Sequence, residues 1–424
     1  MNGVFVKKEI NDGIRVFVNS TDKFKTITVK VFVHQSLREE TVTKTALIPF
    51  VLKRGCEFMP TSQEITTYLE NLYGAGFDVD IIKKGERQII EFDMDVVNDK
   101  FLPPNTEGLL EKGLQALKEI MMNPLLENGG FNKTYFEQEK DVLLRNIKDL
   151  FNNKRAYAVE RCFQEMCRDE RFSLYKYGKE EDLEDLDPVK LYDYYDEMLK
   201  HNPIDVFVMG DVDVEKVFET AEKMFKYPRG NIKAIPPTLV DKKVEKEKTV
   251  IEKQKVNQGK LSLGLRTYTV YGDDDYYPLL VCNGILGGGV HSKLFQNVRE
   301  KASLAYYVFS RIEKLKGVMV IASGIEFKDY DKTLDITKKQ ISDLKNGVIS
   351  DYEMSATKKM IISSLKEVAD NPMATINLYL DGVIAGKIEE IDDMIKNIEK
   401  VTKQEVVEAA NKLKLDTVYF LTQE

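Results

Sequence analysis

The sequence predicts an α+β fold of two homologous domains, each a mostly antiparallel sheet with helices packed on one face. Three observations support this prediction. Strand-like and helix-like segments follow one another in the same order twice, and a charged segment containing Pro and Gly separates the two series. The third observation is the length of 424 residues, which exceeds the size at which a single hydrophobic core stops growing.

The first series begins with residues 26–34, where apolar and polar side chains alternate as in a strand. We expect an apolar helix over 43–54, although Pro49 weakens it, and an amphipathic helix over 62–73 with Ser62 as its N-cap. A hairpin, four helices and a closing strand complete the series. These later segments are the strands 77–83, 87–96 and 205–209 and the helices at 108–122, 134–152, 155–169 and 188–199.

Residues 228–258 are charged and poor in large apolar groups, which predicts a linker leading into an edge strand. The second series follows, and its last helix begins at Thr402 with Glu405 completing a capping box. Its other segments are the strands 260–267, 304–312, 317–324 and 417–421 and the helices 275–286, 291–300, 328–345, 350–369 and 372–385. The predicted domains are 1–228 and 259–424, joined by the linker and edge strand at 229–258.

Short matches between the two series indicate that a whole domain is duplicated. Gly55 and Gly288 each end an apolar helix at corresponding places. The segment IKDL at 147–150 corresponds to LKEV at 365–368, and VFV at 206–208 corresponds to VYF at 418–420. Because so many elements recur in one order, coincidence is a poor explanation.

Composition and charge exclude several classes of protein. The chain is 43% hydrophobic and 31% charged, as in globular proteins, and its net charge of −8 disfavours nucleic acid and anionic membranes as partners. The N-terminal sequence lacks the apolar core of a secretory signal, and the chain lacks a long apolar run, so we expect a cytoplasmic protein. The four cysteines are too scattered for a disulfide framework, and we expect reduced core thiols.

The three histidines, His34, His201 and His291, lie far apart in the sequence. A zinc motif needs two histidines about one helical turn apart, so that both imidazoles point the same way. No local motif of this kind can therefore form in this chain.

Residues 283–310 read NGILGGGVHSKLFQNVREKASLAYYVFS. This segment, with the two α+β halves and the charged linker, resembles the pitrilysin/insulinase family of zinc peptidases along the whole chain. The family pattern is roughly L-G-G-x-x-x-S-x-L-F-x-x-[LV]-R-E-x-x-x-L-[AG]-Y. The matching residues are Leu286, Gly287, Gly288, Ser292, Leu294, Phe295, Val298, Arg299, Glu300, Leu304, Ala305 and Tyr306.

The resemblance implies that Arg299 and Tyr306 line a cleavage chamber opposite the zinc, hold the substrate backbone and stabilise the oxyanion. A guanidinium and a phenol O–H suit that task, because attack on a peptide carbonyl builds negative charge on oxygen. Without the resemblance, Arg299 reads as a solvated charge at a helix end and Tyr306 as a half-buried strand aromatic. Tyr307 takes the place of Tyr306 if the strand register differs by one residue.

The metal half of the family pattern is H-x-x-E-H on a first-half helix, with a further glutamate from a later helix. The resemblance places these four functions at Ala46, Pro49, Phe50 and Asn146, and none of these residues can act as the family residue does. It therefore implies no cofactor in this chain and zinc in a partner subunit. Glu137 and Glu139 lie near Asn146, and we expect both to be solvated surface carboxylates.

The predicted function is that of the zinc-motif-less subunit of bacterial two-chain processing-protease-like enzymes, inactive alone. Its expected partners are a peptide substrate and either a zinc-motif homologue, forming a heterodimer, or a second copy, forming a homodimer. Two alternatives stay open. One is a non-catalytic, self-assembling scaffold or peptide-binding protein, and the other is a direct metal-dependent hydrolase with an unrecognised site.

Overall fold

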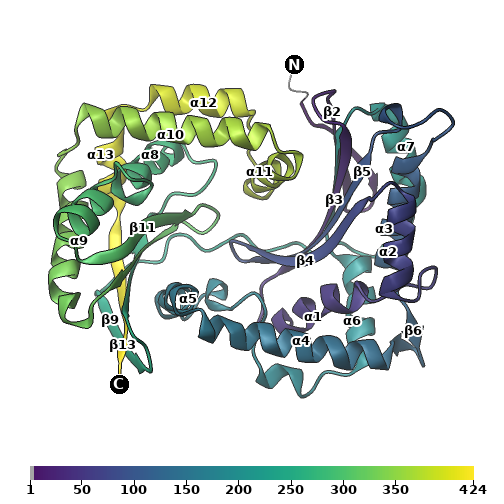
Figure 1. Ribbon diagram of the computed structural model, residues 1–424, viewed down its shortest axis with the longest axis horizontal. Coiled ribbons are helices and arrows are strands. Elements are labelled where there is room, and N and C mark those ends of the chain that lie inside the picture. Colours follow the sequence, from purple (N-terminus) through teal and green to yellow (C-terminus); the bar gives the residue numbers. More distant parts are fainter. Residues whose placement is uncertain (1–3) are drawn as a thin grey trace. The chain divides into compact units, whose positions relative to one another are not determined.

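The computed structural model describes residues 4–424, and the chain divides into two compact units. The first unit contains the residues up to 149, residues 174–237 and residues 372–376. The second contains residues 150–173, 238–371 and 377–424. Each unit consists of a sheet and helices (Figure 1), which confirms the predicted α+β class.

The first unit contains a six-stranded sheet in the order β1-β2-β8-β3-β5-β4. β2 and β8 run parallel, and the other neighbouring pairs are antiparallel. The strands are β1 (Val6–Asn11), β2 (Ile14–Ser20), β3 (Thr26–Ser36), β4 (Gly76–Lys84), β5 (Arg87–Val97) and β8 (Ile204–Gly210), and a small hairpin pairs β6 (Leu126–Glu127) with β7 (Gly130–Phe131).

Helices cover one face of this sheet because alternate strand side chains are apolar. Val29, Val31 and Val33 of β3 join a buried core with residues of the helices, while Lys30 and His34 lie on the opposite face. The helices are α1 (Val42–Leu52), α2 (Ser62–Asn71), α3 (Leu109–Met122), α4 (Lys133–Asn152), α6 (Pro188–His201) and α7 (Val214–Met224), with short 3₁₀ turns η1 (Asp99–Phe101) and η3 (Glu181–Leu183).

The second unit contains a five-stranded sheet in the order β11-β12-β10-β13-β9. Met319 and Ile321 of β12 belong to the core under the helices of one face, while Val318 and Val320 face the other way. The strands are β9 (Lys248–Gln254), β10 (Gly259–Arg266), β11 (Ala305–Glu313), β12 (Val318–Ile325) and β13 (Lys414–Gln423). The helices are α5 (Lys154–Met166), α8 (Tyr276–Gly287), α9 (Tyr330–Lys345), α10 (Asp351–Ala369), α11 (Pro372–Ala385, of which residues 372–376 group with the first unit), α12 (Ile391–Lys400) and α13 (Lys403–Lys412), with 3₁₀ turns η2 (Arg171–Ser173) and η5 (Phe327–Asp329) and a π-helix, η4 (Phe295–Lys301).

The two sheets share one topology. The order β2-β8-β3-β5-β4 corresponds strand for strand to β9-β13-β10-β12-β11, and in each sheet the first pair is parallel and the rest are antiparallel. β1 is the strand that the first sheet has in addition. The short sequence matches fall on corresponding elements, namely α1 with α8, α4 with α10, and β8 with β13. The predicted duplication therefore agrees with the topology.

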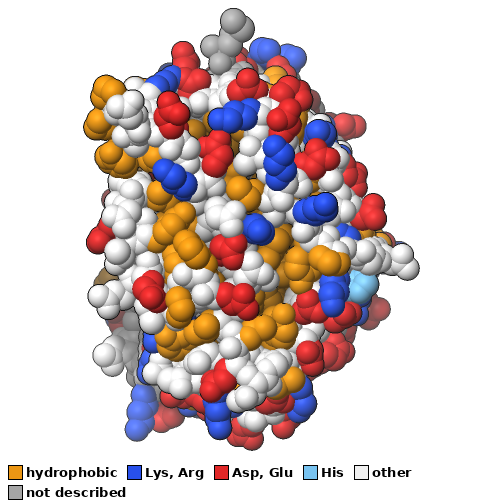
Figure 2. Space-filling model, turned by 90° about the vertical axis from the view of Figure 1, so that its right-hand side faces the viewer, with side chains coloured by type: hydrophobic (Ala, Val, Ile, Leu, Met, Phe, Trp, Pro, Cys, Tyr) orange, Lys and Arg blue, Asp and Glu red, His pale blue; other side chains and the backbone are white. Residues whose placement is uncertain are grey.

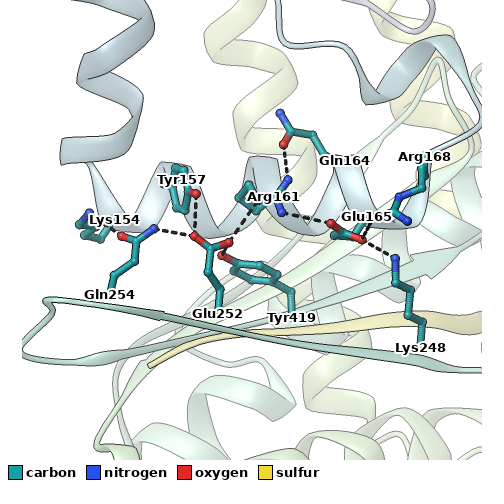
Figure 3. Close-up of polar contacts among 10 residues, drawn as sticks. All are labelled: Lys154, Tyr157, Arg161, Gln164, Glu165, Arg168, Lys248, Glu252, Gln254 and Tyr419. Atoms are coloured by element: carbon teal, nitrogen blue, oxygen red, sulfur yellow. Dashed lines mark hydrogen bonds and ion pairs between the residues drawn. The ribbon is translucent and has the colours of Figure 1, made fainter. Parts of the chain in front are cut away.

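The unit to which residues 150–173 belong differs from the sequence prediction. They fall within the predicted first domain, 1–228, but group with the second unit. Helix α5 packs on the sheet face that the other helices leave open, and Ala158 and Cys162 share a core cluster with Tyr419 and Leu421. Polar contacts hold the helix as well. Figure 3 shows the carboxylate of Glu252 on β9 receiving hydrogen bonds from side chains of α5 and of β13.

A buried ion network fixes the end of the same segment. The Arg266 guanidinium donates to both carboxylate oxygens of Glu170, at 3.0 and 2.6 Å, and Lys316 Nζ lies 2.7 Å from Glu170 Oε2. The side chains of Glu170, Arg266 and Lys316 are 2%, 1% and 0% exposed, so this carboxylate compensates two buried cations. Buried charges of this kind are costly unless they are paired, and moving residues 150–173 away from the second sheet would leave Arg266 and Lys316 without Glu170.

Several local details differ from the sequence prediction. The N-cap of α2 is Thr61, whose side chain accepts from the Glu64 backbone N–H, and not Ser62. Residues 295–301 form a π-helix where an α-helix was expected. The sequence analysis missed β1, β2, α7 and α12, although the buried Ile391, Met394 and Ile398 of α12 have clear helical spacing.

Other details are confirmed. The capping box at Thr402 and Glu405 forms, β9 is an edge strand, and Pro49 lies inside α1 without ending it. All four cysteines are free and buried.

Among the helices within residues 4–424, none combines the length and apolar character needed to cross a bilayer. On the face of the molecule in Figure 2, acidic and basic side chains are interspersed.

Candidate functional site

Arg299 lies on η4, a π-helix of seven residues, and its side chain is 44% exposed. Its guanidinium carbon lies 4.9 Å from the centre of the Phe295 ring, and its Nε is 3.9 Å from Glu300 Oε1. The aromatic face positions the cation while leaving guanidinium N–H groups available to solvent or a ligand. π-Helical turns occur frequently at functional sites, which is consistent with the role that the resemblance implies.

Tyr306 lies on β11 at a β-bulge. Ala305 pairs with Ile325 and Tyr307 with Gly324, so Tyr306 is the extra residue between two consecutive partners. The bulge re-aims its side chain, which is 60% exposed, whereas Ala305 is buried in the helix-side core. The predicted register therefore needs one correction: strand alternation does not hold between Ala305 and Tyr307.

The Tyr306 hydroxyl donates a hydrogen bond to Glu326 Oε1. This bond and the negative charge of Glu326 raise the pKa of Tyr306 above its ordinary value. A tyrosine phenol is protonated at neutral pH, and a raised pKa keeps it protonated to a higher pH, so Tyr306 can act as a hydrogen-bond donor. To donate to a substrate oxygen, the hydroxyl has to turn away from Glu326.

A tight connection joins the elements that carry the two candidate residues. The Leu304 backbone N–H donates to the Val298 carbonyl at 3.0 Å, which closes the end of η4. Ser303 takes a left-handed backbone conformation with φ of 52°, a region that non-glycine residues adopt rarely. Arg299 and Tyr306 are thus both exposed and are carried by adjacent elements of one unit.

The four residues to which the resemblance assigns the lost metal functions lie in the first unit, on α1 and α4. Ala46 and Pro49 are buried in the helix-side core, and Phe50 packs against Tyr177 with ring centres 6.2 Å apart. None of these three side chains carries an atom that binds zinc, and Asn146 offers only a neutral amide. The residues at this place do not fit a zinc ion.

Glu139 on α4 corrects a prediction. It is not a solvated carboxylate but is 7% exposed, and its Oε1 lies 3.3 Å from an Arg54 guanidinium nitrogen. Burial raises the pKa of Glu139, and the charge of Arg54 opposes this effect. Glu137, two residues earlier on α4, is exposed as expected.

The histidines have separate partners. His34 is completely buried, and its Nε2 lies 3.0 Å from Asp205 Oδ2. His201 Nδ1 lies 3.0 Å from the Asn231 carbonyl oxygen, and His291 Nε2 lies 2.8 Å from Thr357 Oγ1. Within residues 4–424, no three His, Cys, Asp or Glu side chains gather closely enough to hold a metal ion.

Comparison with protein families and curated proteins adds independent information. Residues 185–361 match the family described as "Peptidase M16 inactive domain". The chain is 39% identical to a "probable inactive metalloprotease" of Bacillus subtilis, YmfF, with 98% of this chain and 97% of that protein covered. It is 21% identical to an "uncharacterized zinc protease" of the same bacterium, YmxG, with 95% and 94% covered.

Solved structures share the fold. A conserved protein from Enterococcus faecalis superposes with a TM-score of 0.92 and 29% identity, covering 99% of both chains. A protease from Helicobacter pylori has a TM-score of 0.80 at 17% identity, covering 99% of both chains. A "peptidase M16 inactive domain" from Pseudomonas fluorescens has a TM-score of 0.83 at 16% identity, covering 99% of this chain and 98% of that one.

Proposed function

This chain is an inactive member of the peptidase M16 family, and from that premise we propose that it acts in the cytoplasm as the metal-free subunit of a two-chain peptidase. Arg299 and Tyr306 bind the substrate and stabilise the oxyanion, while a homologous partner with H-x-x-E-H supplies the metal centre. The pattern of retained and lost residues carries the proposal. The Arg/Tyr half keeps exposed polar donors on η4 and β11, whereas Ala46, Pro49 and Phe50 offer the metal half none.

The chemistry assigned to this chain is electrostatic. The Arg299 guanidinium presents several N–H donors in a rigid fork, and the Tyr306 phenol adds one O–H donor. Aimed at the carbonyl oxygen of a scissile peptide bond, these donors favour the transition state, in which negative charge develops on that oxygen. No proton has to leave either side chain in this role.

The substrate is an unfolded peptide or segment held in extended form. Each sheet has edge strands, β9 and β11 in the second unit, whose outward N–H and C=O groups can accept another strand. Main-chain pairing of this kind is tolerant of sequence. A chain with this arrangement can therefore serve a processing enzyme that accepts several peptides.

Mixing the purified chain with a zinc-motif homologue from the same genome tests the proposal. We expect the mixture to cleave a quenched-fluorescent, unstructured peptide at least about 1000-fold faster than the sum of the separate chains, since a single oxyanion donor contributes about 100- to 1000-fold and this chain supplies two. We also expect the two chains to co-purify in equal amounts.

The alternatives give other outcomes. Self-assembly with no gain in cleavage on mixing would favour a non-catalytic scaffold or peptide-binding protein. Stoichiometric zinc in this chain alone, with unaided peptide turnover, would favour a direct hydrolase with an unrecognised site. Either result would contradict the proposed division of labour.

A further inference from the structure

One row of the second sheet brings Tyr307 and Lys260 to the same face. Gly324 of β12 pairs with Tyr307 on one side and with Lys260 on the other. A Cβ atom on Gly324 would lie 2.5 Å from Tyr307 Cε1, so the Tyr307 ring crosses the strand over this glycine. The absence of a side chain at 324 therefore lets the tyrosine lean toward Lys260, whose Nζ is 5.6 Å from the ring centre.

Arg155, in the first turn of α5, stacks on the same aromatic surface. Its guanidinium carbon lies 4.4 Å from the centre of the Tyr307 ring and 4.8 Å from that of Phe309. The two rings are stacked with centres 6.2 Å apart. A guanidinium held flat on aromatic rings keeps its edge N–H groups free to bind a planar anion.

Among the residues that the structure describes, neither Arg155 nor Lys260 forms an ion pair with a carboxylate, and Lys260 donates only to Gln258 Oε1. The chain has 70 acidic and 62 basic residues, so an unpaired pair of neighbouring cations is not explained by a shortage of carboxylates. Burial, and then the charge of Arg155, lower the pKa of Lys260, and the negative charge of a bound anion would act in the opposite direction.

The position of Arg155 is fixed by its helix. Lys154 Nζ, one residue before the arginine, donates to Gln254 Oε1 at 2.6 Å, and the Tyr157 hydroxyl, two residues after it, donates to Glu252 Oε1 at 2.7 Å (Figure 3). The Asn153 side chain caps the same turn by accepting from the Ala156 N–H. The aromatic and cationic groups are therefore pre-organised, which lowers the entropic cost of binding.

We propose that Arg155 and Lys260 form a carboxylate-binding subsite at the ring of Tyr307, the residue that follows Tyr306 on β11. This subsite selects peptides that carry a free carboxylate at a fixed distance from the cleaved bond. This inference rests on the proposed function, because it names the substrate class of the same site. The carboxylate can belong to the C-terminus of the peptide or to an Asp or Glu side chain. Both present the planar oxygen pair that a guanidinium binds in bidentate fashion.

Binding to the full-length chain alone tests the subsite separately from catalysis. Three dye-labelled, unstructured peptides are compared by fluorescence anisotropy: a neutral peptide with a free C-terminal carboxylate, its C-terminal amide, and the amide with one internal Glu. We expect at least one carboxylate peptide to bind about tenfold more tightly than the plain amide, as for a hydrogen-bonded charge. The peptide that gains affinity identifies the source of the carboxylate.

Variants locate the effect. Arg155→Gln and Lys260→Met are each expected to remove most of the tenfold preference while binding of the amide changes little, and Arg155→Lys is expected to retain part of it. Lys332→Met removes an exposed charge of α9 and serves as the matched control, with the preference unchanged. Thermal melting confirms that each variant is folded.

Two results would overturn the subsite: equal affinity for carboxylate and amide peptides, or a preference that survives in the Arg155→Gln, Lys260→Met double variant. Neither depends on a partner chain. Loss of the preference together with intact Arg299-dependent cleavage would reject the subsite and leave the proposed function standing. A clear preference for carboxylate peptides without cleavage in the mixture would support the subsite and reject the proposed function.

Discussion

Replacing Arg299 by alanine is expected to lower kcat/KM of the mixed two-chain enzyme by about 100- to 1000-fold, the usual effect of removing one oxyanion donor. The Phe295 ring positions the guanidinium of Arg299, and no other cation on η4 is stacked on that ring. Alanine at this position offers no hydrogen-bond donor to replace it. The measurement is steady-state cleavage of a quenched-fluorescent peptide by equimolar chains. Because the donor acts mainly in the transition state, most of the loss should appear in kcat.

The control for this experiment is Arg168→Ala. Arg168 lies in the same unit, and its side chain is 70% exposed. It forms an ion pair with Glu165 of α5. It should leave cleavage unchanged. If Arg299→Ala matched this control, with both mixtures still assembled, the shared-site proposal would be wrong.

Replacing Glu170 by glutamine is expected to lower the free energy of unfolding of the second unit by about 3–5 kcal/mol, the usual cost of removing one charged partner from a buried ion pair. Arg266 and Lys316 would then keep their charges without the Glu170 carboxylate, although Arg266 would still pair with Asp416. Glutamine has nearly the same shape, so the effect reports charge and not volume. Urea unfolding followed by circular dichroism measures it.

Asp169→Asn is the matched control, because Asp169 is the neighbouring carboxylate, is 82% exposed and forms only a surface pair with Lys242. Exposed pairs of this kind contribute about 0–1 kcal/mol, so this variant should unfold almost as the unmodified chain does. Equal stability of the two variants would show that the network around Glu170 contributes nothing measurable.

The same carboxylate predicts a pH dependence. Burial acts to raise the pKa of Glu170, but hydrogen bonds from Arg266 and Lys316 outweigh it, and the pKa lies below its ordinary value. A carboxyl with a lowered pKa in the folded state stabilises the fold above the unfolded pKa of about 4.3 and loses this contribution as the pH falls. Between about pH 5 and pH 3, the unmodified chain should therefore lose more stability than Glu170→Gln. Parallel curves for the two proteins would contradict this assignment.

The fold class and the duplication could be predicted from the sequence because they depend on local patterns. Alternating apolar residues in 26–34 and the capping box at Thr402 are fixed by neighbouring residues, and the structure confirms the segments that they mark. The candidate residues Arg299 and Tyr306 came from a motif, and the structure shows both exposed on adjacent elements. Their role stays a prediction until the mixed enzyme is tested.

The sequence alone determined the two α+β halves, because these follow from short-range spacing of residues, and its resemblance to a known family implied the lost metal ligands and the roles of Arg299 and Tyr306. Only the tertiary structure decided the π-helix at 295–301, the bulge at Tyr306 and the placement of residues 150–173 on the second sheet. Those features depend on groups that meet only after folding. Glu170 finds Arg266 across 96 residues, and no local pattern records which distant charge a buried carboxylate will need.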